Sequence, residues 1–225
     1  MTGTAMNDFF TFSATALPIL VEGVKYTVLV TFCSLILSTL LGLTWALMRL
    51  SAHRPLRLVS GAVVNVLRGI PMLVQLFYIY FVLPDIGIEM SALTAAIIGL
   101  GIAYSVYQAE DFRAGIQAID KGQIEAAQTL GMSKRLMMRR VILPQAIKII
   151  WPSYGNTMVM MLKDSSLAST ITVAELSLQG KLLASATFQN TTVFTLVALL
   201  YLVMCWPLMW LCRRVEHAMN KRRSH

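Results

Sequence analysis

Two charged residues lie inside stretches of sequence that are otherwise apolar. Arg68 falls about ten residues into one apolar run, and Asp164 closely follows another. A charged side chain at bilayer depth is costly unless it is paired or faces a polar cavity, so such residues mark solute pathways. With the hydroxyls of Ser165 and Ser166, they supply both signs of charge and hydroxyl groups, which a zwitterionic solute requires. The alternatives are that Arg68 snorkels to the headgroups and that Asp164 caps a helix at the outer surface.

Both charged residues adjoin an irregular piece of chain. Gly69 and Pro71 interrupt the apolar run of Arg68, because proline lacks the N–H that continues a helix. The run 149–162 holds 14 residues, which is about 21 Å as a helix and too short for a core of about 30 Å. Either this helix continues to about Thr170, or it is a half-span. Interrupted and short apolar segments are typical of solute sites near the bilayer midplane.

A further segment combines helix-forming residues with turn residues. Residues 125–130 favour a helix, Gly131 suits the left-handed position after a helix, and Ser133 can cap the next one. The pattern predicts a helix, a turn and a second helix that Pro144 ends or kinks.

This segment has two interpretations. The small side chains of Ala126 and Ala127 leave a flat helix face that another protein can approach closely, and Glu125 offers a carboxylate to a basic partner. In the alternative, the helix pair is an amphipathic segment that lies on the inner leaflet. Its basic residues would then contact lipid headgroups: Lys134, Arg135, Arg139 and Arg140.

The composition shows what kind of protein carries these groups. Of 225 residues, 56% are hydrophobic and 13% are charged, and the mean hydropathy is +0.66. Soluble domains have roughly 45–50% apolar and 25% charged residues, and a soluble fold of this size could not cover so much apolar side chain. Disordered chains need low hydrophobicity and high charge. The chain is therefore predicted to be an all-α integral membrane protein.

The apolar runs and basic clusters predict the topology. We expect five spans, at residues 26–48, 58–83, 91–109, 149–170 and 191–212, with Ser91 capping the third. Fifteen of the 19 Lys and Arg residues fall in 49–57, 113–148 and 213–225. The positive-inside rule then places the N-terminus outside and the C-terminus inside. The remaining segments are an external or interfacial segment (1–21), a helix or hairpin on the outer surface (171–188) and a basic cytoplasmic tail (214–225).

Several kinds of chemistry are not predicted. The sequence contains no G-x-x-x-x-G-K-[ST] loop for ATP phosphates and no HExxH or GxSxG motif. The three histidines, His53, His217 and His225, lack the spacing of metal ligands, and the basic clusters form no face for nucleic acid. We expect no enzyme activity, metal or nucleic-acid partner in this chain, so any ATP and Mg²⁺ must be bound by a separate subunit.

Five short motifs together resemble one family. Glu125-Ala-Ala, Gly131 and Ile142-Leu-Pro resemble the EAA loop of ATP-binding-cassette (ABC) importer permeases. Motifs typical of the polar amino acid subfamily, the histidine/glutamine/arginine type, occur in the same order as in that subfamily. They are Arg68-Gly-Ile-Pro71 with Leu73-Val-Gln75, Ala109-Glu110 with Phe112-Arg113, Lys121-Gly-Gln123, and Leu162-Lys-Asp164-Ser-Ser-Leu167. The sequence departs from the family at Ile70, where threonine is usual, and at Asp111, where an apolar residue is usual.

The resemblance implies a function and partners. It implies an ABC transmembrane type-1 domain over residues 22–213, with 113–148 as the loop that couples to a cytosolic ATPase dimer through Glu125, Ala126, Ala127 and Gly131. It implies a substrate pathway that includes Arg68, Gly69, Pro71, Gln75, Asp164, Ser165 and Ser166. It further implies a second permease subunit, an extracytoplasmic solute-binding protein, an amino acid substrate and the bacterial cytoplasmic membrane. The alternative function is a self-sufficient small carrier or channel.

Overall fold

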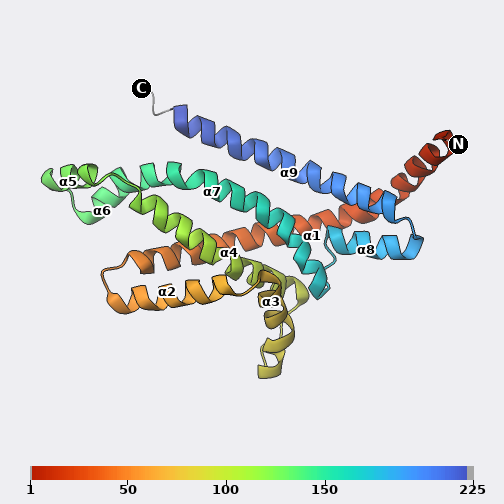
Figure 1. Ribbon diagram of the computed structural model, residues 1–225, viewed down its shortest axis with the longest axis horizontal. Helices are drawn as coiled ribbons and strands as arrows, with labels where there is room; N and C mark the ends of the chain where they lie inside the picture. The colour runs from red at the N-terminus through yellow and green to blue at the C-terminus, as the bar shows by residue number, and fades with distance from the viewer. Residues whose placement is uncertain (1, 222–225) are drawn as a thin grey trace.

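Residues 2–221 are described by a computed structural model, and they form helices and short connections with no β-strand among them (Figure 1). The prediction of an all-helical chain is confirmed. In chain order the helices are α1 (Thr2–Leu50), α2 (Arg54–Gly69), α3 (Met72–Phe77), η1 (Tyr78–Val82), η2 (Leu83–Ile86), α4 (Ala92–Gln117), α5 (Lys121–Thr129), α6 (Lys134–Met137), η3 (Met138–Ile142), α7 (Leu143–Asp164), η4 (Ser165–Ile171), α8 (Leu176–Thr187) and α9 (Asn190–Lys221).

Three helices among the described residues are long and apolar enough to cross a bilayer. They comprise residues 11–50 of α1, all of α4 and residues 190–219 of α9. The bent pair formed by α2 and residues 72–86 makes a fourth if it counts as one span. Helix α7 has 22 residues but is not in this set, because polar and charged residues recur along it. The chain is thus a multi-pass membrane protein, and the count of five spans stays a prediction.

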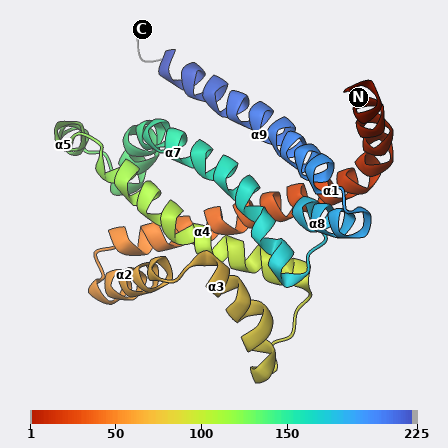
Figure 2. The same cartoon turned by 45° about the vertical axis from the view of Figure 1, so that its right-hand side comes forward.

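The first helix differs from its predicted start. Residues 1–21 were expected to form a segment separate from the span at 26–48, but α1 runs without a break from Thr2 to Leu50. Pro18 lies inside it, where a missing N–H and a bulky ring favour a kink. Figure 2 shows the N-terminal part of α1 turned away from the remainder of the helix.

The second predicted span is broken where the sequence has glycine and proline. α2 and residues 72–86 meet at an angle of 102°. Ile70, the residue before Pro71, takes an extended conformation. It does so because a proline disfavours helical backbone angles in the residue that precedes it. The Gln75 side-chain amide donates to the carbonyls of Leu67 and Ile70, at 2.8 and 2.9 Å. These hydrogen bonds satisfy carbonyls that the break would leave free.

Helix α4 lies at the centre of the fold. Its Ser91 cap is confirmed, since the Ser91 hydroxyl accepts from the Thr94 N–H, and the helix extends to Gln117, beyond the predicted end at residue 109. It packs along α1 on one side and against α7 on another. The core around it joins residues from α1, α3, α4 and η4: Val30, Leu76, Ala95, Leu100 and Ile171.

Pro144 lies in the first turn of α7. Of the two outcomes predicted for it, an end or a kink of the second helix, the end is wrong. The chain is helical from Lys134 through α6, η3 and α7 to Asp164. Pro144 has no N–H, so it cannot donate the helical hydrogen bond to the carbonyl of Arg140. A π-helical turn precedes it, in which the Leu143 N–H donates to the Met138 carbonyl. The first turn of a helix tolerates proline, so α7 starts there.

The connection after α7 confirms one of two alternatives. The helix continues through Asp164 and then tightens into the 3₁₀ helix η4, which ends at Ile171. Of the two forms proposed for residues 171–188, the helix is the one observed, as α8.

Glu175 caps α8 and is fully buried. Its carboxylate accepts from the N–H groups of Ser177 and Leu178, both at 2.9 Å, and from the Tyr201 hydroxyl at 3.0 Å. Burial is the largest influence and raises the pKa of the Glu175 carboxyl above its ordinary 4.5, while these hydrogen bonds lower it. The cap joins α8 to α9 and, through the Thr27 hydroxyl at 3.4 Å, to α1.

Several helix ends gather at two opposite ends of the molecule. Figure 1 shows the α1–α2 turn, α5, α6 and the C-terminal end of α9 at one end of the molecule. The N-terminal part of α1 and α8 lie at the other end (Figure 1). The three basic segments, 49–57, 113–148 and the tail, therefore lie at the same end wherever the structure describes them.

Candidate functional site

A cavity of about 470 Å³ lies where the break after α2 meets α4 and α7. Both charged residues singled out in the sequence, Arg68 and Asp164, line it. The remaining lining residues come from α3, α4 and α7: Met72, Tyr104, Tyr107, Glu110, Asp111, Ser153, Thr157 and Met160. The fold thus brings together two residues that are far apart in the sequence.

Asp164 and Arg68 are each held by a tyrosine of α4. The buried Tyr104 hydroxyl donates to the Asp164 Oδ2 at 2.6 Å, and the Arg68 guanidinium lies 5.6 Å from the centre of the Tyr107 ring. No ion pair among the described residues joins Arg68 to Asp164. Neither charge is therefore neutralised by the other.

Glu110 and Asp111 are cavity residues that the sequence analysis did not select. Glu110 forms ion pairs with Arg49 of α1 and with Arg113, the latter at 2.8 Å. Asp111 Oδ2 accepts from the Ser153 hydroxyl of α7 at 2.7 Å. Helical spacing was a usable signal, because Tyr104, Tyr107 and Asp111 recur at intervals of three and four and so share one face of α4.

The other predicted pathway residues do not line this cavity. Gln75 holds the helix break, and Pro71 precedes the first residue of α3. Ser165 is buried and donates to the Leu162 carbonyl at 2.7 Å, while Ser166 is half-buried and Gly69 is exposed. Gln75 and Ser165 therefore hydrogen-bond to backbone carbonyls near the cavity.

The local structure of the predicted coupling segment is confirmed. Asp120 caps α5, and Gly131 has φ of 73°, the left-handed conformation expected after a helix. The Met132 N–H donates to the Ala127 carbonyl at 3.1 Å, which completes a Schellman-type end. Ser133 then caps α6 by accepting from the Leu136 N–H.

The two alanines of this segment face different surroundings. Glu125 and Ala126 are exposed, but Ala127 is buried in a cluster with Met137 and Ile142. Ala127 therefore allows α5 to pack on its own chain. The exposed surface at the tip of the turn instead includes Leu130, whose side chain is 81% exposed.

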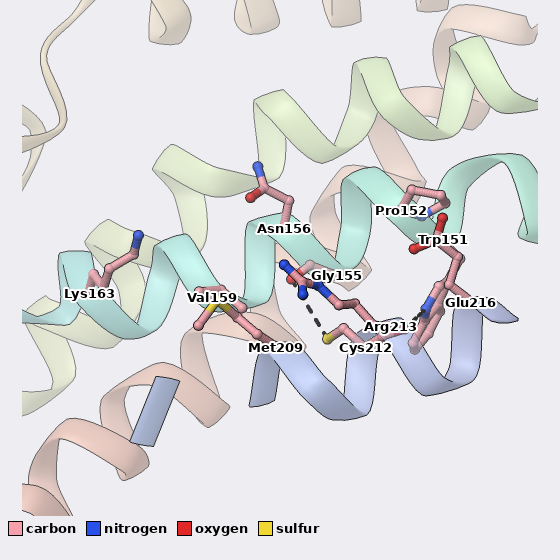
Figure 3. A pocket seen from close by; sticks show the side chains of 10 residues that line it. All are labelled: Trp151, Pro152, Gly155, Asn156, Val159, Lys163, Met209, Cys212, Arg213 and Glu216. Atoms are coloured by element: carbon pink, nitrogen blue, oxygen red, sulfur yellow. Dashed lines mark hydrogen bonds between the residues drawn. The ribbon is translucent and has the colours of Figure 1, made fainter. Parts of the chain in front are cut away.

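A second cavity, of about 270 Å³, lies between α7 and α9 (Figure 3). Figure 3 shows Trp151 near one end of this groove and Lys163 near the other. The Trp151 ring N–H donates to the Cys212 carbonyl at 3.0 Å. A Cβ on Gly155 would lie 3.1 Å from Cys212 Cβ, so glycine permits the close approach of the two helices here. Neither this groove nor any other group of described residues gathers three side chains that could hold a metal ion.

Comparison with known proteins identifies the family. Residues 38–221 match the model of the binding-protein-dependent transport system inner membrane component family. The chain is 41% identical over 208 residues to the probable amino-acid ABC transporter permease protein YckA of Bacillus subtilis, covering 92% of this chain and 90% of that protein. It is 38% identical over 187 residues to the probable glutamine ABC transporter permease protein GlnM of the same organism, covering 83% and 87%.

A solved structure agrees with these relatives. A crystal structure of an amino acid ABC transporter with histidines superposes with a TM-score of 0.87 and 39% identity, covering 93% of this chain and 98% of that one. The chain belongs to the binding-protein-dependent transport system inner membrane components. It is the permease subunit of an ABC importer of the amino acid type, a transport component that works with an ATPase and a binding protein. The prediction of this function is confirmed, and nothing supports the alternative of a self-sufficient carrier.

Proposed function

We propose that this permease carries its amino acid through the cavity between α4 and α7. Arg68 binds the α-carboxylate of the solute, and Asp164 binds its α-ammonium group. The observation that carries the proposal is that Arg68 and Asp164 line one cavity without pairing with each other. A zwitterion supplies the missing partner to each, so it lowers the cost of holding these charges at membrane depth.

The proposal extends to the coupling of transport to ATP hydrolysis. The turn from Glu125 to Gly131 docks on a separate cytosolic ATPase dimer, which binds ATP and Mg²⁺. The exposed residues of this turn include Glu125, Ala126 and Leu130. The helix is continuous from Lys134 to Asp164. A movement of the turn is therefore transmitted along α6, η3 and α7 to the carboxylate in the cavity.

The membrane arrangement follows from charge and geometry. The basic segments, which gather at one end of the fold, face the cytoplasm by the positive-inside rule. The N-terminus is then outside and the C-terminus inside, with α7 as the fourth of five spans, in the bacterial cytoplasmic membrane. A second permease subunit completes the pathway, and an extracytoplasmic solute-binding protein delivers the amino acid.

Reporter fusions test this arrangement. Fusions at His53, at Ser133 and in the tail are expected to read as cytoplasmic, and fusions at Gly87 and Ala186 as external. A tail on the external side would contradict the arrangement.

Uptake by the reconstituted complex tests the cavity. Asp164→Asn keeps the size of the side chain but removes the charge that binds the ammonium group, so uptake should fall to background while the complex still assembles. The matched control is Asp85→Asn, which makes the same change in η2, away from the cavity. Wild-type uptake by Asp164→Asn would show that Asp164 has only a structural role.

A further inference from the structure

Helix α9 carries an exposed apolar stripe that the proposed pathway does not use. The stripe consists of Leu199, Val203, Trp206 and Trp210, whose side chains are between 49% and 66% exposed. Because these residues recur at intervals of three and four, they share one face of the helix. Figures 1 and 2 show α9 along one edge of the molecule. Exposed apolar surface of this kind marks a contact with lipid or with another subunit.

The stripe ends at a pocket that basic side chains line. The pocket has a volume of about 460 Å³, and its lining residues are Trp210, Arg213, Arg214, His217 and Ala218. Arg213, Arg214 and His217 follow Trp210 at three, four and seven residues, so the pocket continues the face of the stripe. Among the described residues, no acidic side chain lines it. The pocket therefore suits an anion.

The two arginines of the pocket lack a counter-charge. The Arg214 guanidinium lies 4.4 Å from the centre of the Trp210 ring, and a cation–π contact positions a charge without neutralising it. Glu216 is the acidic residue closest to them in the sequence, but it lines the cavity between α7 and α9 instead. No ion pair among the described residues joins Glu216 to Arg213 or Arg214.

We infer that an anionic phospholipid binds along this face of α9, with its phosphate at Arg213 and Arg214 and an acyl chain on the apolar stripe. The distance from Leu199 to Trp210 is eleven residues, or about 16 Å along the helix. This length is about half of a hydrocarbon core of about 30 Å, and so it matches one leaflet. Trp210 lies between the apolar and basic parts, where tryptophan is favoured at the bilayer interface. In the proposed membrane arrangement the leaflet is the inner one.

A second copy of the permease fits this face less well than a lipid does. Two copies have the same orientation in the membrane, so a symmetric contact through the stripe brings the same end of α9 from each copy together. Arg213 and Arg214 of one copy would then face Arg213 and Arg214 of the other. Such like-charge contacts are unfavourable, whereas the phosphate of an anionic lipid supplies the missing counter-charge.

Native mass spectrometry of the purified permease–ATPase complex in detergent tests the inference. The probes are dioleoyl phosphatidylglycerol and dioleoyl phosphatidylcholine, which have the same acyl chains but differ in net charge. We expect the complex to bind phosphatidylglycerol at least about tenfold more tightly, equivalent to about 1.4 kcal/mol. Glycerol 3-phosphate carries a phosphate without acyl chains, so it should compete at least about tenfold more weakly than unlabelled phosphatidylglycerol.

Variants separate the basic pocket from general charge and from the apolar stripe. Arg213→Gln combined with Arg214→Gln should reduce the preference for phosphatidylglycerol to about twofold or less. The matched control combines Arg54→Gln with Arg57→Gln, which removes two exposed arginines at the same end of the molecule, and it should keep the wild-type preference. Trp206→Ser lies on the stripe and should weaken binding of both lipids by a similar factor, because it removes a contact with the acyl chain.

A further variant keeps the inference testable if the double variant is not recovered. Trp210→Leu removes the ring over which Arg214 lies, and the preference for phosphatidylglycerol should fall at least about threefold. An unchanged preference in Trp210→Leu would overturn the inference. Asp164→Asn should leave the lipid preference unchanged, so this inference and the cavity assignment fail independently.

Other results would assign this face of α9 to a different partner. Equal binding of the two lipids by the wild type, an equal loss in the control pair, or strong competition by glycerol 3-phosphate would each overturn the inference. A disulfide between two permease copies through Val203→Cys, with the native cysteines replaced by alanine, would show that a second copy covers the stripe. Loss of the ATPase from the variant with both Arg213→Gln and Arg214→Gln would show that the pocket binds the ATPase instead.

Discussion

Helix α7 has two faces that meet their neighbours in different ways. Toward α4 it presents Ser153, Thr157 and Asp164, which line a cavity and bond to polar groups across it. Toward α9 it presents Gly155 and Val159, and there the helices approach until Gly155 nearly touches Cys212. The contacts on the first face are hydrogen bonds around the larger cavity, of about 470 Å³. The second face borders a smaller cavity, of about 270 Å³, and packs closely on α9 at Gly155.

This difference suggests that the two faces of α7 have different roles. A close-packed face keeps its partner at a fixed distance, because even small changes in volume are unfavourable there. A polar face around a cavity can exchange its hydrogen bonds for contacts with a solute. We expect substitutions on the α9 face to affect assembly, and substitutions on the α4 face to affect transport by an assembled complex.

The most general effect, a loss of folded permease, is expected on the packed face. Gly155→Leu places a side chain where Cβ alone would lie 3.1 Å from Cys212 Cβ, and overpacking of this kind typically costs about 1–3 kcal/mol. The amount of folded permease recovered from membranes should fall severalfold, as measured by fluorescence-detected size exclusion. Gly61→Leu is the control, because no atom lies within 4 Å of its Cβ position. Equal recovery of the two variants would contradict the packing argument.

A second effect, on the coupling of transport to ATP hydrolysis, is expected from a substitution in the turn at Gly131. This substitution leaves the packing of α7 against α9 unchanged. Gly131→Val forces a β-branched residue to adopt φ of 73°, which costs on the order of 1–3 kcal/mol and distorts the turn. Amino-acid-stimulated ATPase activity should drop about tenfold or more, a change of about 1.4 kcal/mol or more, while the permease remains folded. Gly87→Val imposes similar strain at φ of 83° in the segment after η2 and should retain the stimulation. Leu130→Asp, on the exposed tip of the turn, should weaken retention of the ATPase during purification.

A smaller effect is expected within the cavity. Tyr104→Phe keeps the ring but removes the 2.6 Å hydrogen bond to Asp164, and a bond to a charged group contributes about 1.5–3 kcal/mol. The concentration for half-maximal uptake should rise about tenfold, with no loss of assembled complex. Tyr107→Phe keeps the ring under Arg68 and should change uptake by less than about twofold, since the cation–π contact needs no hydroxyl. An identical effect of the two substitutions would show that the Asp164 contact has no special role.

The sequence was sufficient to predict features that depend on local residue preferences. Ser91, Gly131 and Ser133 act as expected, because caps and left-handed turn positions are determined by a few adjacent residues. The helix break beside Arg68 was also foreseen, because Gly69 and Pro71 interrupt the apolar run, although its 102° angle was not.

Features that depend on packing between distant helices were not predicted. Ala127 was expected to form an open docking face but lies in a core with Met137, because its exposure depends on how α5 folds back on η3 and α7. The contacts of Asp111 and Tyr104 with α7 were also missed, since nothing local shows that α4 and α7 are neighbours. Glu175 was not singled out in the sequence, although its contacts with Thr27 and Tyr201 make it a buried link between helices.

The central claim is that the α4 face of α7 contacts the transported amino acid and the α9 face does not. Thr157 and Val159 permit a direct test, since each side chain is 7% exposed and each lines a different one of the two cavities. In a permease whose Cys33, Cys205 and Cys212 are replaced by alanine, Thr157→Cys and Val159→Cys would be labelled with a small thiol reagent. The rates are compared with and without the amino acid that most stimulates the ATPase. We predict that the amino acid slows labelling at position 157 severalfold and leaves position 159 unchanged. Equal protection of the two positions, or none at position 157, would contradict the claim.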